Sequence, residues 1–415
     1  MKSSIIAAAS AASGLVAADN VPTVHFPLTL LYGNNEKIHT TLTKPETNTT
    51  IPVVYDSGSE NFFVFGPGAI DNWGSSNIGV RGQCNASVPE SDLFDYKLST
   101  TASQPVDHPA TYIYGGADKI YGGSVTINDT FIFVNDDGLS YTLENTRVEL
   151  VDFLTQRIRD TTCSYAPLYD LGILGVSPFY QGAGRNTTGP SVRQDLLDRG
   201  IIGASVQSMW FDEAPEDPLA PYTGNGLIGG IDTSKYSGDL VKVKTVVPGG
   251  ANVGYFTEMP TVSINGHTFT QTDSVTYCQL DSGTHDDTIP IAYAENDLFE
   301  NITGIITSPI GYTSWNGTCD TIPTNITVDL TFPGVVDGTS VTVKTPLRAY
   351  ARVDYGEPGY CAMSVGVSGC FLGSPFHSAA FFAADDEHGE IALAQGGVSK
   401  PGSSFDPASV VGRIP

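Results

Sequence analysis

Two short stretches contain residues that could do chemistry together: VVYDSGS at 53–59 and CQLDSGT at 278–284. Each is an apolar run that ends in Asp-Ser-Gly and a hydroxyl residue. A single Asp-Ser-Gly is an ordinary turn sequence. Two copies in matching contexts, in opposite halves of the chain, indicate a common purpose. If the two stretches meet in the fold, Asp56 and Asp281 form a pair of facing carboxyl groups.

Two carboxyl groups about one hydrogen bond apart share a proton, because like charges at that distance oppose each other. The ionised group can take a proton from a bound water, while the protonated group donates a hydrogen bond to a substrate carbonyl. Such a pair suits hydrolysis by an activated water.

The residues that follow each aspartate suit this arrangement. We expect three kinds of support, each with one residue from each copy: a reciprocal hydrogen-bond brace under the loops (Ser57 and Ser282), hydrogen bonds to the outer carboxylate oxygens (Ser59 and Thr284), and close approach of backbone N–H groups to the carboxylates (Gly58 and Gly283).

Short apolar or alternating runs, separated by Gly, Pro and Asn, predict the elements that position these loops. They lie before about 135 and again from about 240 onward, and the Gly-rich stretch 225–240 divides them. Each half also has two apolar residues followed by Gly, namely ILG ending at Gly175 and FLG ending at Gly373. This repetition predicts an all-β fold of two lobes related by a pseudo-twofold axis, with the two Asp loops meeting between them.

Few segments have a helical pattern. The clearest is SVRQDLLDRG, in which Ser191 can cap the N-terminus and Gly200 ends the helix. Its buried stripe is expected to consist of Val192, Leu196 and Leu197. A second short helix is expected at about 292–301.

The charge balance argues against two classes of partner. The chain has 415 residues, with 45 acidic and 20 basic side chains, a net charge of -25 and a pI near 4.4. Such a surface repels phosphate backbones and anionic lipid, so neither nucleic acid nor a membrane is expected as a partner. The sequence contains neither a C-x-x-C nor an H-E-x-x-H pattern, so it does not indicate a metal site, and no cofactor is expected.

The first 18 residues resemble a signal peptide, with Lys2, an apolar run and small residues ending at Ala18. The sequence therefore predicts a secreted, extracellular glycoprotein with disulfide bonds. Seven N-x-S/T sequons occur, at Asn48, Asn85, Asn128, Asn186, Asn301, Asn316 and Asn325. Six cysteines form an even set, Cys84, Cys163, Cys278, Cys319, Cys361 and Cys370.

Beyond the paired motifs, several stretches carry a family resemblance: TYIYGGADKIYGG, DLGILGVSP, LIGGIDTSKYSGDL and FLGSPFHSAAFFAADDEHGEIALA. With these the chain resembles a pepsin-like (family A1) aspartic protease, and is most similar to the fungal secreted members. The resemblance implies a bilobal acid protease fold, with an N-terminal lobe at 19–236 and a C-terminal lobe at 237–415. It also implies a monomeric endopeptidase that acts on proteins or peptides in acid through Asp56 and Asp281.

The resemblance extends to the flap and to the disulfides. Tyr114 and Gly115 fall at the tyrosine-glycine of the family's flap, a β-hairpin that closes over bound peptide; Tyr114 could also be an ordinary cross-strand aromatic. The resemblance implies one disulfide, Cys319–Cys361. A second candidate pair is Cys278 with Cys370, each three residues before a motif end on strands expected to be neighbours, which leaves Cys84 with Cys163 as the third.

Three departures from the family pattern support a different function. Phe63 replaces the usual Trp, the run His285-Asp286-Asp287 follows the second motif, and residues 19–55 are too few for an inhibitory pro-segment. The extra carboxylates would raise the pKa of the pair if they were close and ionised, or would otherwise point to solvent. The alternative is a catalytically impaired homologue that serves as a secreted binding or inhibitor protein. A carbohydrate-active enzyme with two carboxylates has only that pair in its favour.

The sequence leaves one local question open and assigns one acidic run to a turn. Tyr255 and Phe256 suit either a substrate cleft or the core. The acidic run DDEHGE at 385–390 lacks the ligand spacing of a calcium loop, and its Gly389 predicts a solvated hairpin turn.

Overall fold

The structure is a computed structural model of the 415-residue chain. It describes residues 21–30, 37–44, 46, 49–74, 84–115, 118–135, 138–158, 163, 168–178, 189–248, 254–308, 313–354, 359–403 and 406–415. The predicted signal peptide at 1–18 and the sequon residues Asn48 and Asn186 lie outside these ranges.

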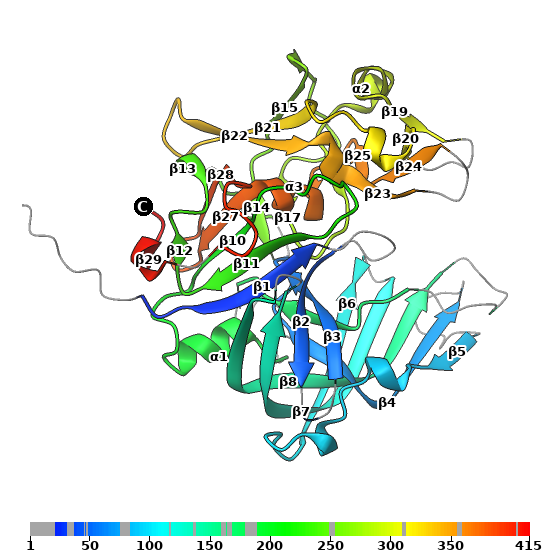
Figure 1. Cartoon of the computed structure of the whole chain (residues 1–415), viewed down its shortest axis with the longest axis vertical. Coiled ribbons are helices and arrows are strands. Elements are labelled where there is room, and N and C mark those ends of the chain that lie inside the picture. The colour runs from blue at the N-terminus through cyan, green and yellow to red at the C-terminus, as the bar shows by residue number, and fades with distance from the viewer. Residues whose placement is uncertain are drawn as a thin grey trace, which may run out of the picture.

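Strands dominate the molecule, as the alternating apolar runs predict, and they form two halves on either side of a central group of strands (Figure 1). One half contains β2 (Ile38–Lys44), β3 (Thr49–Asp56), β4 (Phe62–Gly74), β5 (Cys84–Ser87), β6 (Val106–Tyr114), β7 (Lys119–Val134), β8 (Ser140–Arg157) and β9 (Gly172–Gly175). The central strands are β1 (Val24–Leu30), β10 (Val206–Phe211), β11 (Tyr222–Ile228), β13 (Ser237–Val243), β27 (Ala380–Asp385) and β28 (Glu390–Gln395).

The other half is built from three smaller sheets. Their strands are β14 (Tyr255–Thr257), β15 (Thr261–Ile264), β16 (His267–Thr268), β17 (Cys278–Leu280), β18 (Asp287–Ile289), β19 (Ile305–Thr307), β20 (Thr313–Asn316), β21 (Thr327–Pro333), β22 (Ser340–Pro346), β23 (Ala351–Asp354), β24 (Tyr360–Met363), β25 (Val365–Val367) and β26 (Phe371–Leu372). A short pair, β12 (Ile231–Asp232) with β29 (Val410–Val411), lies beside the central strands.

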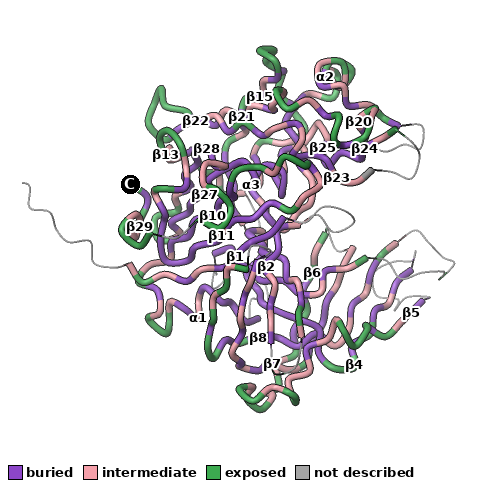
Figure 2. Tube along the Cα trace, viewed as in Figure 1, coloured by how far each residue is buried: buried purple, intermediate pink, exposed green. Residues whose placement is uncertain are grey.

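The central strands and the strands of the first half form one continuous sheet. Its order is β13-β28-β27-β10-β11-β1-β2-β3-β9-β4-β8-β7-β6, so strands from both ends of the chain hydrogen-bond side by side. Buried residues follow these strands through the middle of the molecule, while exposed residues gather at the outer turns (Figure 2). The predicted all-β, bilobal pepsin-like fold is confirmed.

In the described ranges, α-helices are few and short: α1 (Val192–Asp198), α2 (Asn296–Thr303) and α3 (Ser374–Ala379). In α1 the Ser191 side chain accepts a hydrogen bond from the Gln194 N–H, which is the predicted cap. Val192 and Leu196 are buried as expected, but Leu197 is only half-buried. Arg193 is buried in addition, because a cluster of polar groups receives its guanidinium.

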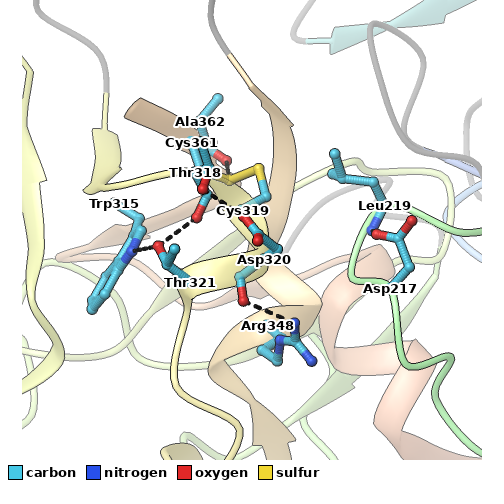
Figure 3. The surroundings of a disulfide bond; sticks show 10 residues. All are labelled: Asp217, Leu219, Trp315, Thr318, Cys319, Asp320, Thr321, Arg348, Cys361 and Ala362. Atoms are coloured by element: carbon cyan, nitrogen blue, oxygen red, sulfur yellow. Dashed lines mark hydrogen bonds between the residues drawn. A yellow bond between two sulfur atoms is a disulfide. The ribbon is translucent and has the colours of Figure 1, made fainter. Parts of the chain in front are cut away.

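The six cysteines form Cys84–Cys163, Cys278–Cys370 and Cys319–Cys361. Figure 3 shows the surroundings of the third pair, where Trp315 donates to the Thr321 hydroxyl at 2.9 Å. Arg348 donates to the carbonyl of Asp320 at 3.2 Å on the other side. Among the described residues, no helix has the length and apolar character needed to cross a membrane.

Candidate active site

The first Asp-Ser-Gly loop begins where β3 ends, at Asp56. Strand β9 runs parallel to β3, and Asp56 pairs with Gly175. The Val176 N–H donates to the Asp56 carbonyl at 2.8 Å. A Cβ atom on Gly175 would lie 2.7 Å from the carbonyl oxygen of Ser59, so only glycine allows the strand to pass this close. The predicted role of the ILG stretch follows from this contact.

The second loop repeats this construction with different strands. Strand β17 runs parallel to β26, and the Asp281 N–H donates to the Leu372 carbonyl at 2.9 Å. A Cβ atom on Gly373 would lie 2.6 Å from the Thr284 carbonyl oxygen. The two halves thus present their aspartates in the same way.

A symmetric hydrogen-bond brace connects the two loops. The Ser57 N–H donates to Ser282 Oγ at 3.0 Å, and the Ser282 N–H donates to Ser57 Oγ at 2.9 Å. Each hydroxyl then donates to a strand of the opposite half, Ser57 to the Leu280 carbonyl at 3.3 Å and Ser282 to the Tyr55 carbonyl at 2.6 Å. Ser57 and Ser282 are buried, so these polar groups depend on each other.

Each carboxylate also accepts two hydrogen bonds from its own loop. The donors are Gly58 N–H to Asp56 Oδ1 at 2.8 Å, Ser59 Oγ to Asp56 Oδ2 at 2.7 Å, Gly283 N–H to Asp281 Oδ1 at 2.8 Å, and Thr284 Oγ1 to Asp281 Oδ2 at 3.3 Å. The first loop has the shorter hydroxyl contact.

The two glycines of the motifs show how close the carboxyl groups lie. A Cβ atom on Gly58 would be 2.5 Å from Asp281 Oδ2, and one on Gly283 would overlap the carboxylate of Asp56. Each loop therefore packs against the carboxyl group of the other. The expected meeting of Asp56 and Asp281 is what the structure contains.

Electrostatics at the pair favour one shared proton. Burial raises the pKa of Asp281 well above its usual range, and the negative charge of Asp56 and a hydrogen bond with Asp56 raise it further. A proton held on Asp281 relieves the repulsion between two adjacent carboxylates.

Tyr114 lies at the end of β6, with Gly115 directly after it at a left-handed φ of 57°. Burial raises the pKa of the Tyr114 hydroxyl well above its usual range, and the negative charge of Asp56 raises it further. Tyr114 thus lies within electrostatic reach of the first aspartate. Its ring is 6.0 Å from that of Phe63, which stacks on Tyr112 with ring centroids 5.2 Å apart. Phe63 fills the site with an apolar ring and offers no donor to the Tyr114 hydroxyl.

The two carboxylates of the run after the second motif differ: Asp286 points to solvent, which is one of the two expectations, and Asp287 does not. The side chains of His285 and Asp286 are 44% and 42% exposed. Asp287 is fully buried and turns inward, where its Oδ1 accepts the Gly373 N–H at 2.7 Å. Burial raises the pKa of Asp287 to about 7. Asp287 thus does not face solvent. It also does not raise the pKa of Asp281, because burial and Asp56 are the causes of that shift.

Two other regions considered in the sequence have structural roles. Tyr255 and Phe256 are buried in the core, and the Tyr255 hydroxyl accepts from Arg193 at 2.8 Å and donates to Asp386 at 3.1 Å. The run 385–390 forms the turn between β27 and β28, with Gly389 at φ 65°. This agrees with a hairpin.

Sequence reasoning overlooked Arg193, which ties the first half to the second. Its Nη1 donates to the carbonyl of Val176 at 2.8 Å, one residue after the glycine that pairs with Asp56. Its Nη2 forms an ion pair with Asp386 at 2.5 Å. A lone Arg on a short helix carries no pattern that would reveal such a partner.

Sequence reasoning also overlooked three charged residues near the first loop, Lys37, Lys119 and Asp170. Both ammonium groups contact the one buried carboxylate. Their positions in the chain are separated by 51 and 133 residues from Asp170, so no local motif could have revealed them.

Comparisons with known proteins agree with this geometry. Residues 41–396 match the family described as "Eukaryotic aspartyl protease". Secreted aspartic protease 5 of Candida albicans (strain SC5314 / ATCC MYA-2876) is 30% identical over 131 residues, which cover 32% of this chain and 27% of that protein. Probable aspartic-type endopeptidase opsB of Aspergillus oryzae (strain ATCC 42149 / RIB 40) is 24% identical over 210 residues, or 48% and 41% of the two chains.

The matched stretches span less than half the length of either relative. The family match, by contrast, covers most of this chain and includes both Asp loops, the region of Tyr114 and the FLG stretch. The chain belongs to the eukaryotic aspartyl protease family.

Proposed function

We propose that this protein is a secreted aspartic endopeptidase that hydrolyses internal peptide bonds of proteins at acidic pH. The observation that carries the proposal is the braced pair of carboxyl groups: two loops from opposite halves exchange hydrogen bonds through Ser57 and Ser282 and pack against each other's aspartate. Such a rigid, symmetric pair suits activation of one water between the two groups.

In the proposed reaction, the ionised carboxylate takes a proton from a water that attacks the substrate carbonyl. The protonated carboxyl group donates a hydrogen bond to the carbonyl oxygen as negative charge develops there, and a proton then passes to the leaving nitrogen. The raised pKa of Asp281 favours this residue as the proton-bearing member in the free protein. Tyr114 and Gly115, at the end of β6, are proposed to close over the substrate.

An acidic working pH follows from the need to keep one proton on the pair. As the pH rises, loss of that proton would leave two adjacent carboxylates and no donor for the substrate carbonyl. Secretion is supported by the signal-like residues 1–18 and by the three disulfides. Of the described sequon residues, Asn85, Asn301, Asn316 and Asn325 are exposed and Asn128 is half-buried, which suits glycosylation.

The test is cleavage of denatured haemoglobin or casein between pH 3 and pH 5, with and without pepstatin. We expect pepstatin-sensitive cleavage that falls by about 10³-fold in Asp56→Asn, because the pair loses its base. Equal rates for wild type and Asp56→Asn, both insensitive to pepstatin, would exclude the proposal.

A second candidate, an impaired homologue with a binding role, is favoured by Phe63 beside Tyr114, since the phenyl ring cannot hydrogen-bond the flap hydroxyl. Pepstatin binding by calorimetry, without turnover of either protein substrate, would support this candidate instead.

A further inference from the structure

Lys37, Lys119 and Asp170 form a charged cluster that the proposed mechanism does not use. Lys37 Nζ lies 2.9 Å from both carboxylate oxygens of Asp170, and Lys119 Nζ lies 3.3 Å from Oδ2. The Asp170 side chain is 3% exposed, whereas those of Lys37 and Lys119 are 17% and 29% exposed. The carboxylate is thus enclosed, and the two lysine side chains are partly exposed, although burial lowers the pKa of Lys119.

The topology places all three residues around the first catalytic loop. His39 pairs with Val54 in the antiparallel β2–β3 register, and Lys37 lies directly before β2, where its charge acts on Asp281. Lys119 is the direct cross-strand partner of Tyr114 in the β6–β7 hairpin. Asp170 lies two residues before β9, the strand that pairs with Asp56.

The cluster carries an excess of positive charge. Burial opposes ionisation of Asp170, yet the ammonium groups of Lys37 and Lys119 hold its pKa below the usual range. His39, which lies beside Lys37, has its pKa lowered to about 4 by burial and so adds little charge above that pH. At Asp170, two cations therefore contact one anion.

The other groups near Lys119 do not cancel this excess in acid. Burial raises the pKa of Asp71 to about 6, so its carboxyl group is neutral at pH 4 to 5. Asp118, the neighbour of Lys119, forms an ion pair with Arg157 at 2.7 Å. The positive charges of Lys37 and Lys119 also act on His285, at the second catalytic loop, so their field reaches across the pair of loops.

A purely structural ion pair would need only one of these cations. In a chain with 20 basic and 45 acidic residues, a second, partly exposed lysine side chain lies next to the proposed flap. Asp170 already binds both lysines, so it is not available to a basic substrate side chain. In the described part of the chain, Lys119 Nζ has one hydrogen bond, to Asp170, and an ammonium has three donors.

We propose that Lys119 and Lys37 form a subsite that binds an acidic side chain of the substrate, glutamate or aspartate, close to the scissile bond. This proposal rests on the proposed endopeptidase function. The substrate carboxylate would accept hydrogen bonds from the partly exposed ammonium groups, while Asp170 orients both from beneath.

The test uses the full-length protein at pH 4.5 and two peptide series built on one cleaved sequence. At each position on either side of the scissile bond, one residue is varied among Glu, Gln, Lys and cysteic acid, whose sulfonate stays ionised in acid. At one position we expect kcat/KM for Glu and cysteic acid to exceed that for Gln by about tenfold, and Lys to be the poorest.

Variants of Lys119 separate recognition from folding. Lys119→Met is expected to reduce the Glu-to-Gln ratio to about two or less, whereas Lys119→Arg retains most of it because the charge and donors remain. The matched control is Lys242→Met, since Lys242 is a 35%-exposed lysine paired with Glu390 at 3.0 Å on the central strands. Its ratio should equal that of the wild type. Melting temperatures check that all variants are folded.

Two outcomes would overturn the subsite: equal kcat/KM for Glu and Gln at every position, or equal losses for all peptides in Lys119→Met. If the protein cleaves nothing, the proposed function fails, but the subsite can still be tested by binding. Calorimetry with uncleavable Glu and Gln peptides should then show about tenfold tighter binding of the Glu peptide, and equal affinities would exclude the subsite.

Discussion

The two Asp-Ser-Gly loops have the same backbone arrangement, but the glycine N–H beside each loop donates to a different kind of acceptor. In the first loop, the Gly175 N–H donates to the backbone carbonyl of Asn61 at 2.9 Å. In the second, the corresponding Gly373 N–H donates to a side-chain oxygen of Asp287 at 2.7 Å. The residue six positions after the catalytic-pair aspartate differs accordingly. It is Phe62, a core side chain, in the first half and Asp287, a buried carboxyl group, in the second.

This difference shows that the repeat is conserved in geometry more strictly than in chemistry. A backbone carbonyl does not titrate, so the support of the first loop is independent of pH. The support of the second loop comes from Asp287, whose pKa burial raises to about 7, so its ionisation places a charge in the core. As the pH rises, the second loop should therefore be destabilised before the first.

The largest expected effect concerns stability. The pKa of Asp287 rises from 3.8 to about 7 on folding, so the unfolded chain loses this proton first as the pH increases. Protonated Asp287 contributes up to about 4 kcal/mol to the free energy of unfolding. This contribution is fully present below about pH 4 and is lost as the pH rises to about 7. Asp287→Asn, which keeps an acceptor for Gly373 but does not ionise, should lose less stability over this range.

Urea unfolding of wild type and Asp287→Asn at pH 4 and pH 7 measures this difference. The pKa of Glu149 is raised to about 8 and that of Asp71 to about 6, both by burial, so the variant should retain part of the pH dependence. Asp286→Asn, one residue away and 42% exposed, is the matched control and should keep most of the wild-type pH dependence, because the Asp286 charge is a smaller cause of the raised Asp287 pKa than burial. Parallel pH profiles for all three proteins would contradict the assignment.

A smaller effect tests the symmetry of the loops themselves. Alanine at Gly58 or Gly283 places a methyl group against the carboxyl group of the opposite loop, so each variant should lose about 1–3 kcal/mol of stability and most proteolytic activity. Gly203→Ala is the control, since a Cβ atom there meets only Pro22 at 3.7 Å.

Chemical unfolding and casein cleavage provide the measurements for these glycine variants. A Gly283→Ala protein that remained as stable and active as Gly203→Ala would show that the loops do not pack against each other as described.

The smallest effect separates the two outer hydroxyls. Ser59 Oγ lies 2.7 Å from its carboxylate, whereas Thr284 Oγ1 lies 3.3 Å from the other. Because the shorter bond is the stronger one, Ser59→Ala should reduce kcat by about tenfold and Thr284→Ala by about threefold. Steady-state kinetics at pH 4 compare the two, and a greater loss in Thr284→Ala would reverse the proposed ranking.

Several features of the site were predictable because they depend on local sequence. Alternating apolar runs fix strands, and Asp-Ser-Gly fixes a tight loop whose N–H and hydroxyl groups turn toward the aspartate. The glycines of ILG and FLG were predictable because each must pass beside such a loop. The inward turn of Asp287 was not, since no sequence pattern tells a buried carboxyl group from an exposed one within His-Asp-Asp.

By itself, the sequence determined the strand-rich class, the two Asp loops and the residues that hold each carboxylate, since these follow from contacts a few positions apart. Only the tertiary structure decided that Tyr255 belongs to the core, that Arg193 ties the two halves together, and that Lys37 and Lys119 meet at Asp170. Those contacts join residues far apart in the chain. Burial and charge select such partners only after the sheets have brought them together.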